Sequence, residues 1–138
     1  MKKLILFALV ASAAFGFVRT ASAQARQISG KIPFSFTAGS ARLAGGEYRI
    51  TYEMSGLVTF HNLDTGGSAV TFVGADDGSK DGSCKLIFSR YGDQYFLKQS
   101  QCKAAHANFF IPTSGLERTA LERAAVSRDA EQTFVAMR

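Results

Sequence analysis

Two cysteines are the residues whose type and spacing point most clearly to chemistry. We interpret one stretch as a β-hairpin, with strands over Cys84–Tyr91 and Gln94–Gln101. Cys84 is its first residue, and Cys102 follows directly after its last. The strands meet at Gly92-Asp93, a pair that suits a type II′ turn. Cysteines of an exported chain are expected to pair, so we predict a disulfide, against the alternative of two free thiols. The absence of a C-x-x-C pattern argues against a redox role.

The register of this hairpin decides whether the bond can form. With a two-residue turn, Tyr91 faces Gln94 and Cys84 faces Gln101, which leaves Cys102 one position out of register. A three-residue turn or one β-bulge would set the two cysteines opposite each other. We therefore expect their Cα atoms on adjacent antiparallel strands, within about 7 Å, the upper reach of a disulfide.

Aromatic and cationic side chains gather around the tip of the same hairpin, at Arg90, Tyr91, Tyr95 and Phe96. One interpretation is a binding rim for a glycan or a partner protein. The other, which we favour, is cross-strand aromatic pairing with an arginine stacked over a ring.

Acidic and histidine residues give little support for a metal site. Asp77, Ser79, Asp81 and Gly82 follow the opening of a calcium-binding loop. The twelfth position of such a loop should be a bidentate glutamate, but here it is a phenylalanine, so we expect an ordinary solvated turn. His61 and His106 lie in strand-like segments without an H-x-H or H-E-x-x-H partner. We expect no metal and no cofactor.

Known catalytic patterns are also missing from the sequence. There is no G-x-S-x-G, no phosphate-binding glycine loop and no conspicuous carboxylate pair, so no catalytic residue is predicted. A serine–histidine–aspartate set is recognised by geometry rather than by sequence order, and a hydrolase therefore stays open as an alternative.

The start of the chain has the order of a secretory signal. Basic Met1-Lys2-Lys3 precedes an apolar run from Leu4 to Val18 and the small-residue site Ala21-Ser22-Ala23, so we expect a signal peptide over 1–23 and one β-rich domain over 24–138. The alternative, a membrane anchor, would need about 20 apolar residues. Removal of the signal lowers the net charge from +5 to +2, and no basic stripe remains for nucleic acid. We expect a periplasmic or extracellular protein with no membrane span after cleavage.

The remaining chain reads as short strands separated by turn residues, a pattern typical of an antiparallel sandwich or small barrel of about seven to eight strands. Its centre is 32–52, interpreted as two strands joined by a tight turn, for which Gly45-Gly46 can supply the positive φ angles. The expected strands are Arg26–Thr37, Glu47–Met54, Leu57–Asn62, Ser68–Gly74, the two hairpin strands, Ala104–Ile111 and a final Thr133–Met137.

A helix is expected between the last two of these strands. Ser114 and Glu117 have the spacing of a capping box, which predicts a helix from Ser114 to about Arg128. Its apolar stripe, expected to pack on the sheet, comprises Leu116, Ala120, Leu121, Ala124 and Ala125.

Three stretches carry a resemblance: I-P-F-S-F-T-A-G, L-A-G-G-E-Y-R-I and L-I-F-S-R-Y-G-D-Q-Y-F-L. Together they resemble a family of small secreted proteins of environmental Gram-negative bacteria, whose members read P-F-x-F, L-P-A-G-x-Y and F-x-R-Y-G-D-x-Y-F-L at these places. The resemblance covers most of the chain after the signal. It implies a compact β-rich domain and no established activity. Ala44 and Gly45 depart from the proline and alanine that the family favours.

The sequence therefore favours a secreted or periplasmic non-enzymatic β domain with a binding or structural role. The alternatives are a hydrolase on the same scaffold and a small carrier with an apolar ligand inside a barrel. A pocket with convergent polar groups would favour the enzyme, and a long dry cavity would favour the carrier. A filled core with an exposed aromatic patch would favour the binding domain.

Overall fold

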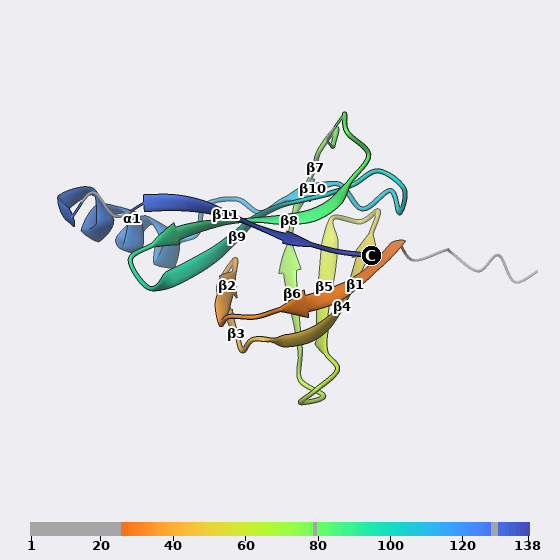
Figure 1. Ribbon diagram of the computed structural model, residues 1–138, viewed down its shortest axis with the longest axis horizontal. Coiled ribbons are helices and arrows are strands. Elements are labelled where there is room, and N and C mark those ends of the chain that lie inside the picture. The colour runs from red at the N-terminus through yellow and green to blue at the C-terminus, as the bar shows by residue number, and fades with distance from the viewer. Residues whose placement is uncertain (1–25, 79, 128–129) are drawn as a thin grey trace, which may run out of the picture.

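A computed structural model describes residues 26–78, 80–127 and 130–138, so the expected signal, 1–23, lies outside the described residues. Figure 1 shows strands in two layers with helix α1 at one end. The elements are β1 (Arg26–Ile32), β2 (Phe36–Ala38), β3 (Ala41–Leu43), β4 (Gly46–Glu53), β5 (Leu57–Asn62), β6 (Ser68–Phe72), β7 (Gly74–Ala75), β8 (Cys84–Tyr91), β9 (Gln94–Cys102), β10 (Phe109–Phe110), α1 (Gly115–Ser127) and β11 (Ala130–Ala136).

The strands form two sheets. Sheet A has the order β1-β4-β5-β6, and sheet B has the order β11-β8-β9-β10-β7, with the β2–β3 hairpin attached to β9. Every strand pair is antiparallel except β2 with β9, which are parallel at Thr37 and Phe96. The predicted mainly β fold with a C-terminal helix is confirmed. The described strands outnumber the expected seven or eight because several are only two or three residues long.

The region 32–52 differs from its prediction. Strands β1 and β4 do pair, with Ile32 opposite Gly46, but no tight turn at Gly45-Gly46 joins them. The first strand ends before Pro33, which cannot donate to a ladder, and the hairpin β2–β3 is inserted between the two strands. Gly39, with φ of 63°, lies in the turn of that hairpin.

Two further strand predictions were wrong in extent. The predicted strand 104–111 is reduced to Phe109–Phe110, because residues 103–106 form a turn in which His106 has φ of 51°. The predicted strand 68–74 divides at Val73 into β6 of sheet A and β7 of sheet B. The final strand begins earlier than predicted, at Ala130, and pairs with β8 along its full length.

Aromatic rings fill the space between the sheets. Phe36 packs edge-on against Tyr48, Phe60 and Phe88, with ring centroids 5.5–6.2 Å apart. These rings are buried, as is Phe109. Edge-to-face packing of this kind stabilises a core beyond the area that it buries. The period-2 pattern that predicted a half-buried β4 is confirmed, since Tyr48, Ile50 and Tyr52 all face the core.

Helix α1 lies at one end of the fold, near the β8–β9 turn (Figure 1), and contacts β8 and β11 of sheet B. The helix residues Ala120 and Ala124 are buried. The sheet residues Ile87 and Phe96, which lie outside the main core cluster, are buried as well. Leu116 and Leu121, which the predicted stripe included, are exposed, and Glu117 is buried in their place. The reason is a polar contact beneath the first turn, described below.

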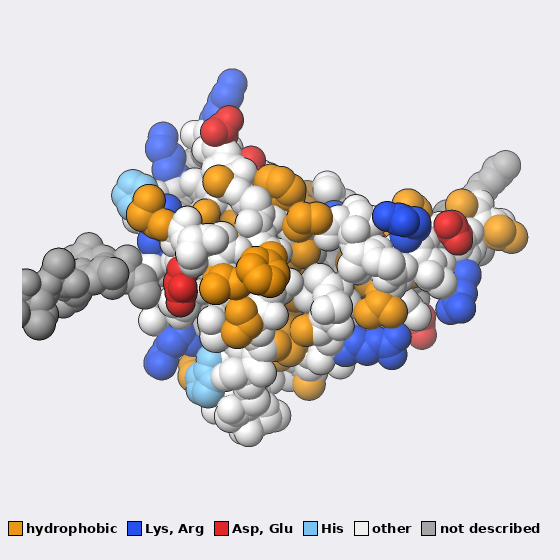
Figure 2. All heavy atoms as spheres, turned by 180° about the vertical axis from the view of Figure 1, so that it is seen from behind, with side chains coloured by type: hydrophobic (Ala, Val, Ile, Leu, Met, Phe, Trp, Pro, Cys, Tyr) orange, Lys and Arg blue, Asp and Glu red, His pale blue; other side chains and the backbone are white. Residues whose placement is uncertain are grey.

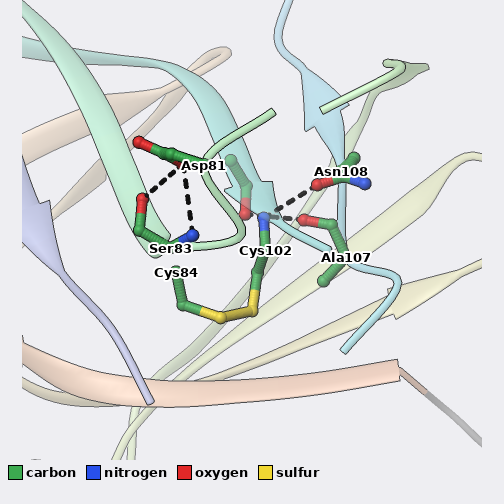
Figure 3. The surroundings of a disulfide bond; sticks show 7 residues. Asp81, Ser83, Cys84, Cys102, Ala107 and Asn108 are labelled. Atoms are coloured by element: carbon green, nitrogen blue, oxygen red, sulfur yellow. Dashed lines mark hydrogen bonds between the residues drawn. A yellow bond between two sulfur atoms is a disulfide. The ribbon is translucent and has the colours of Figure 1, made fainter. Parts of the chain in front are cut away.

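The predicted disulfide is confirmed. Cys84 and Cys102 are bonded, lie directly opposite each other and have Cα atoms 4.1 Å apart. The register is corrected by a β-bulge: Ile87 pairs with Gln99, and Phe88 pairs with Leu97, so the residue between them has no partner. Figure 3 shows the bond at the base of the hairpin, where the Cys102 amide also donates to Asn108 Oδ1. Gly92 at the tip has the positive φ, 65°, that a type II′ turn requires.

Candidate functional site

An open groove lies where three segments that are distant in sequence converge. One wall is the β2–β3 region, the second is the tip of the β8–β9 hairpin, and the third is helix α1. Its volume is about 330 Å³, at the lower end of the range for ligand sites, which is about 300–1,000 Å³. A smaller hollow of about 230 Å³ shares Asp93, Gln94, Ala120 and Arg123 with it and extends the groove along the helix.

Two arginines give the groove its charge. Arg42 comes from β3 and Arg123 from α1, both exposed, and neither forms an ion pair with any residue in the described ranges. The groove has one acidic residue, Asp93, at the hairpin turn. The walls also carry hydroxyl and amide groups from Ser35, Thr119 and Gln94. The combination of guanidinium and neutral polar groups is suited to an anionic, hydroxyl-rich ligand.

The helical wall is held in place by a polar cluster beneath its first turn. Lys98 Nζ lies 2.7 Å from Glu117 Oε2 and also donates to Thr113 Oγ1 at 3.1 Å. The Tyr91 hydroxyl donates to Glu117 Oε1 at 3.2 Å. The predicted helix cap is confirmed, because Ser114 Oγ accepts from the Glu117 amide at 3.2 Å. Glu117 therefore ties the start of the helix to both strands of the hairpin.

Burial raises the pKa of the Tyr91 phenol above its ordinary value of about 10. The negative charge of Glu117 acts in the same direction, since a second anion beside a carboxylate is unfavourable. A hydrogen bond with Ser89 opposes part of this increase. Tyr91 consequently stays a neutral hydrogen-bond donor at physiological pH.

The structure divides the four residues of the predicted rim between the two faces of the hairpin. Tyr91 and Phe96 lie under the helix, with their rings 5.8 Å apart. Arg90 and Tyr95 are cross-strand partners on the other face. Arg90 bonds the Gly92 carbonyl at 2.8 Å and pairs with Glu131. These contacts hold the tip in shape, and Tyr95 and Phe96 also line the groove.

The ring of Tyr95 packs on a residue outside the hairpin and not on the cross-strand aromatic partner that the sequence predicts. The ring stacks on Phe34 at 4.0 Å, with an interplanar angle of 16°. Phe34 in turn packs edge-on against the core residue Phe88. The stack connects the floor of the groove to the core.

The two histidines have separate hydrogen-bond partners. His61 Nδ1 and Ser68 Oγ are 2.7 Å apart across β5 and β6. No carboxylate within the described residues lies within 4 Å of the His61 ring, so the pair lacks the orienting acid of a catalytic triad. The backbone carbonyl of His106 accepts a hydrogen bond from Arg26.

The calcium-like segment forms local contacts. Asp81 accepts from the amide and hydroxyl of Ser83 and pairs with Lys85 at 3.5 Å, as Figure 3 shows in part. Asp77 donates its amide to Asp76, and Ser79 lies outside the described residues. No group of three or more metal-binding side chains occurs in the part of the chain that the structure describes.

Sequence reasoning missed both arginines of the groove and the lysine under the helix. Arg42 lies in a segment interpreted as a connection, and Arg123 is one of several charges on an amphipathic helix. Only the fold brings them together. The bulge at Lys98 did leave a signal, because the cysteine register required one irregularity somewhere in the hairpin.

Comparison of the chain with models of protein families, with curated proteins and with solved structures gave no match. Among the described residues, no helix has the length and apolar character needed to cross a membrane.

Proposed function

We propose that this protein is an exported, non-enzymatic binding domain whose groove takes an acidic glycan segment. One observation carries the proposal. Arg42 and Arg123, brought from separate elements and without ion-pair partners in the described residues, line the same open hollow. Both guanidinium groups are exposed and open to a ligand, and each could form paired hydrogen bonds with a carboxylate.

The walls support a sugar rather than a purely apolar ligand. Arginine forms paired hydrogen bonds to carboxylates, while Ser35, Thr119 and Gln94 offer groups that can bond sugar hydroxyls. Leu43 and Leu116 add apolar surface at the margins. A groove formed by three braced segments needs little reorganisation on binding, which reduces the entropic cost.

The filled core favours binding at the surface over carriage inside a barrel. Interlocked rings occupy the space between the sheets, and the hollows described above are open to solvent. Export is supported by the basic, apolar and small-residue order of residues 1–23, and a disulfide is compatible with an oxidising compartment.

The proposal is tested by calorimetric titration with an oligogalacturonate, using maltooligosaccharide of equal length as the neutral control. Arg42→Gln or Arg123→Gln should each weaken binding roughly 10- to 100-fold, the loss expected for one hydrogen-bonded ion pair. Arg118→Gln is the matched control, since Arg118 is an exposed arginine of the same helix outside the groove. It should bind as the wild type does.

Three outcomes would contradict the proposal: no binding of the acidic oligomer, equal binding of the neutral one, or equal loss in all three variants. Equal loss would indicate attraction by overall charge rather than a site. Binding of an acidic peptide in preference to the sugar would replace the glycan by a protein partner.

A further inference from the structure

A stripe of exposed apolar side chains runs along β6, the last strand of sheet A. Val70 and Phe72 are 58% and 77% exposed and alternate with inward residues, so they share the outer face of sheet A. After Val73 the chain enters sheet B, where Gly74 pairs with Phe110, and a Cβ on Gly74 would collide with the Phe110 ring, which is 44% exposed. Phe110 thus occupies the place of the missing side chain. Figure 2 shows hydrophobic side chains gathered near the middle of the face seen from behind.

The stripe has features that a solvent-facing strand usually avoids. The segment from Gly66 to Ala75 contains no charged residue. Exposed, uncharged strands with large apolar side chains tend to associate, and monomeric proteins normally protect them with lysine, proline or a bulge. Leu57, directly opposite Phe72 on β5, adds to the same surface.

Across β4, β5 and β6, the pairing register sets three cross-strand rows on the outer face of sheet A. Arg49, His61 and Ser68 form the first row. Thr51, Thr59 and Val70 form the middle row. Glu53, Leu57 and Phe72 form the third row.

These rows are self-complementary under a two-fold rotation. An axis along the middle row sets the first row of one copy over the third row of the other. Arg49 then faces Glu53 of the second copy, and Phe72 packs beside the Ser68 and Val70 positions. Both charged residues are exposed, and neither has an ion pair with another described residue. The same arrangement therefore buries the apolar stripe and pairs Arg49 with Glu53.

We infer that the occupant of this surface is a second copy of this chain, and that the protein forms a two-fold dimer through the outer faces of its A sheets. Face-to-face packing of two sheets is a common way to bury such a surface. The groove between β3, the hairpin tip and α1 lies on other elements, so each copy would keep its groove open. The inference does not depend on the proposed ligand.

Sedimentation equilibrium of the purified protein tests the dimer. The wild type should pass from monomer to dimer as its concentration rises to about 1 mM. Phe72→Ser should weaken association at least about tenfold. Phe134→Ser is the matched control, because Phe134 is 56% exposed on β11, in the other sheet. It should leave the association constant unchanged.

A charge exchange tests the orientation of the two copies. Glu53→Arg alone should weaken the dimer, because it would face Arg49 of the other copy. Adding Arg49→Glu in the same chain should restore it. A monomer at every concentration, an association unaffected by Phe72→Ser, or a double variant no better than Glu53→Arg would overturn the inference. Thermal unfolding of each variant confirms that it is folded.

Discussion

Lys98 Nζ lies 2.7 Å from Glu117 Oε2, and Lys98 is the residue of β9 that the β-bulge leaves without a cross-strand partner. The irregularity that brings the cysteines into register therefore also supplies the cation that holds the helix. Glu117 is buried whereas Lys98 is partly exposed. The two partners should consequently differ in what their removal costs.

Removal of Lys98 should be the more damaging change. Lys98→Ala leaves a buried carboxylate with only Tyr91 beside it, which should cost about 3 kcal/mol. Glu117→Ala should cost less, because the freed ammonium can reach water. The double variant should be more stable than Lys98→Ala alone. Denaturant unfolding measures all three, with the exposed Glu122→Ala as a control expected within about 0.5 kcal/mol of the wild type. Equal effects of both single changes would contradict this asymmetry.

The raised pKa of Tyr91 predicts a dependence of stability on alkaline pH. The folded state holds the phenol proton more tightly than the unfolded chain, whose pKa is about 10. This contribution to the free energy of unfolding is complete below pH 10 and is lost as pH rises through the folded pKa. Tyr91→Phe should show a shallower decline above pH 10 in urea unfolding. An unchanged slope would show that Tyr91 is not the group responsible.

Gly46 should resist substitution, though for a reason other than the predicted turn. Its φ is 155°, and a Cβ there would lie 2.9 Å from Asp64 Oδ2 and 3.0–3.1 Å from the Asn62 amide. Asn62 is buried and accepts from the amides of Asp64 and Thr65, so it has little room to move. Gly46→Val should lower the free energy of unfolding by more than about 1 kcal/mol. Gly115→Ala should leave the free energy of unfolding nearly unchanged, because a Cβ at Gly115 would meet no neighbouring atom. Similar melting temperatures for the two variants would refute the explanation by steric conflict at Gly46.

The disulfide should contribute about 3 kcal/mol, because it closes a loop with a sequence separation of 18 in the unfolded chain. Replacing Cys84 and Cys102 together by serine should lower the free energy of unfolding by about this amount. Thiol titration of the denatured, unreduced wild type should find no free cysteine. Two titratable thiols would refute the bond.

The sequence predicted the parts of the fold that depend on local pattern. Strand alternation, the Gly92-Asp93 turn and the Ser114 cap are local signals, and each is found where expected. The cysteine pairing also followed, because covalent geometry allows few registers. These predictions needed no knowledge of how distant segments meet.

The groove could not be predicted in the same way. Arg42 and Arg123 are 81 positions apart in the sequence, and their proximity depends on where the β2–β3 hairpin and α1 are placed. The inserted hairpin was itself missed, although its loop, Gly39-Ser40, has the composition of a two-residue hairpin turn. Its strands are only three residues long, and Gly45-Gly46 nearby has turn composition as well. Similarly, a buried glutamate within an amphipathic helix is not expected until its lysine partner is known.

The most direct test of the proposed function is a titration followed by NMR of the arginine side chains. Signals of the Arg42 and Arg123 Nε–H groups are assigned by loss in the corresponding Arg→Gln variants. On addition of oligogalacturonate, these two signals and the Tyr95 and Thr119 amides should shift together with one dissociation constant, and salt should weaken the effect. The Nε–H signal of Arg118 should not shift. The absence of saturable shifts at Arg42 and Arg123, or equal shifts at Arg118, would contradict an acidic-glycan site in this groove.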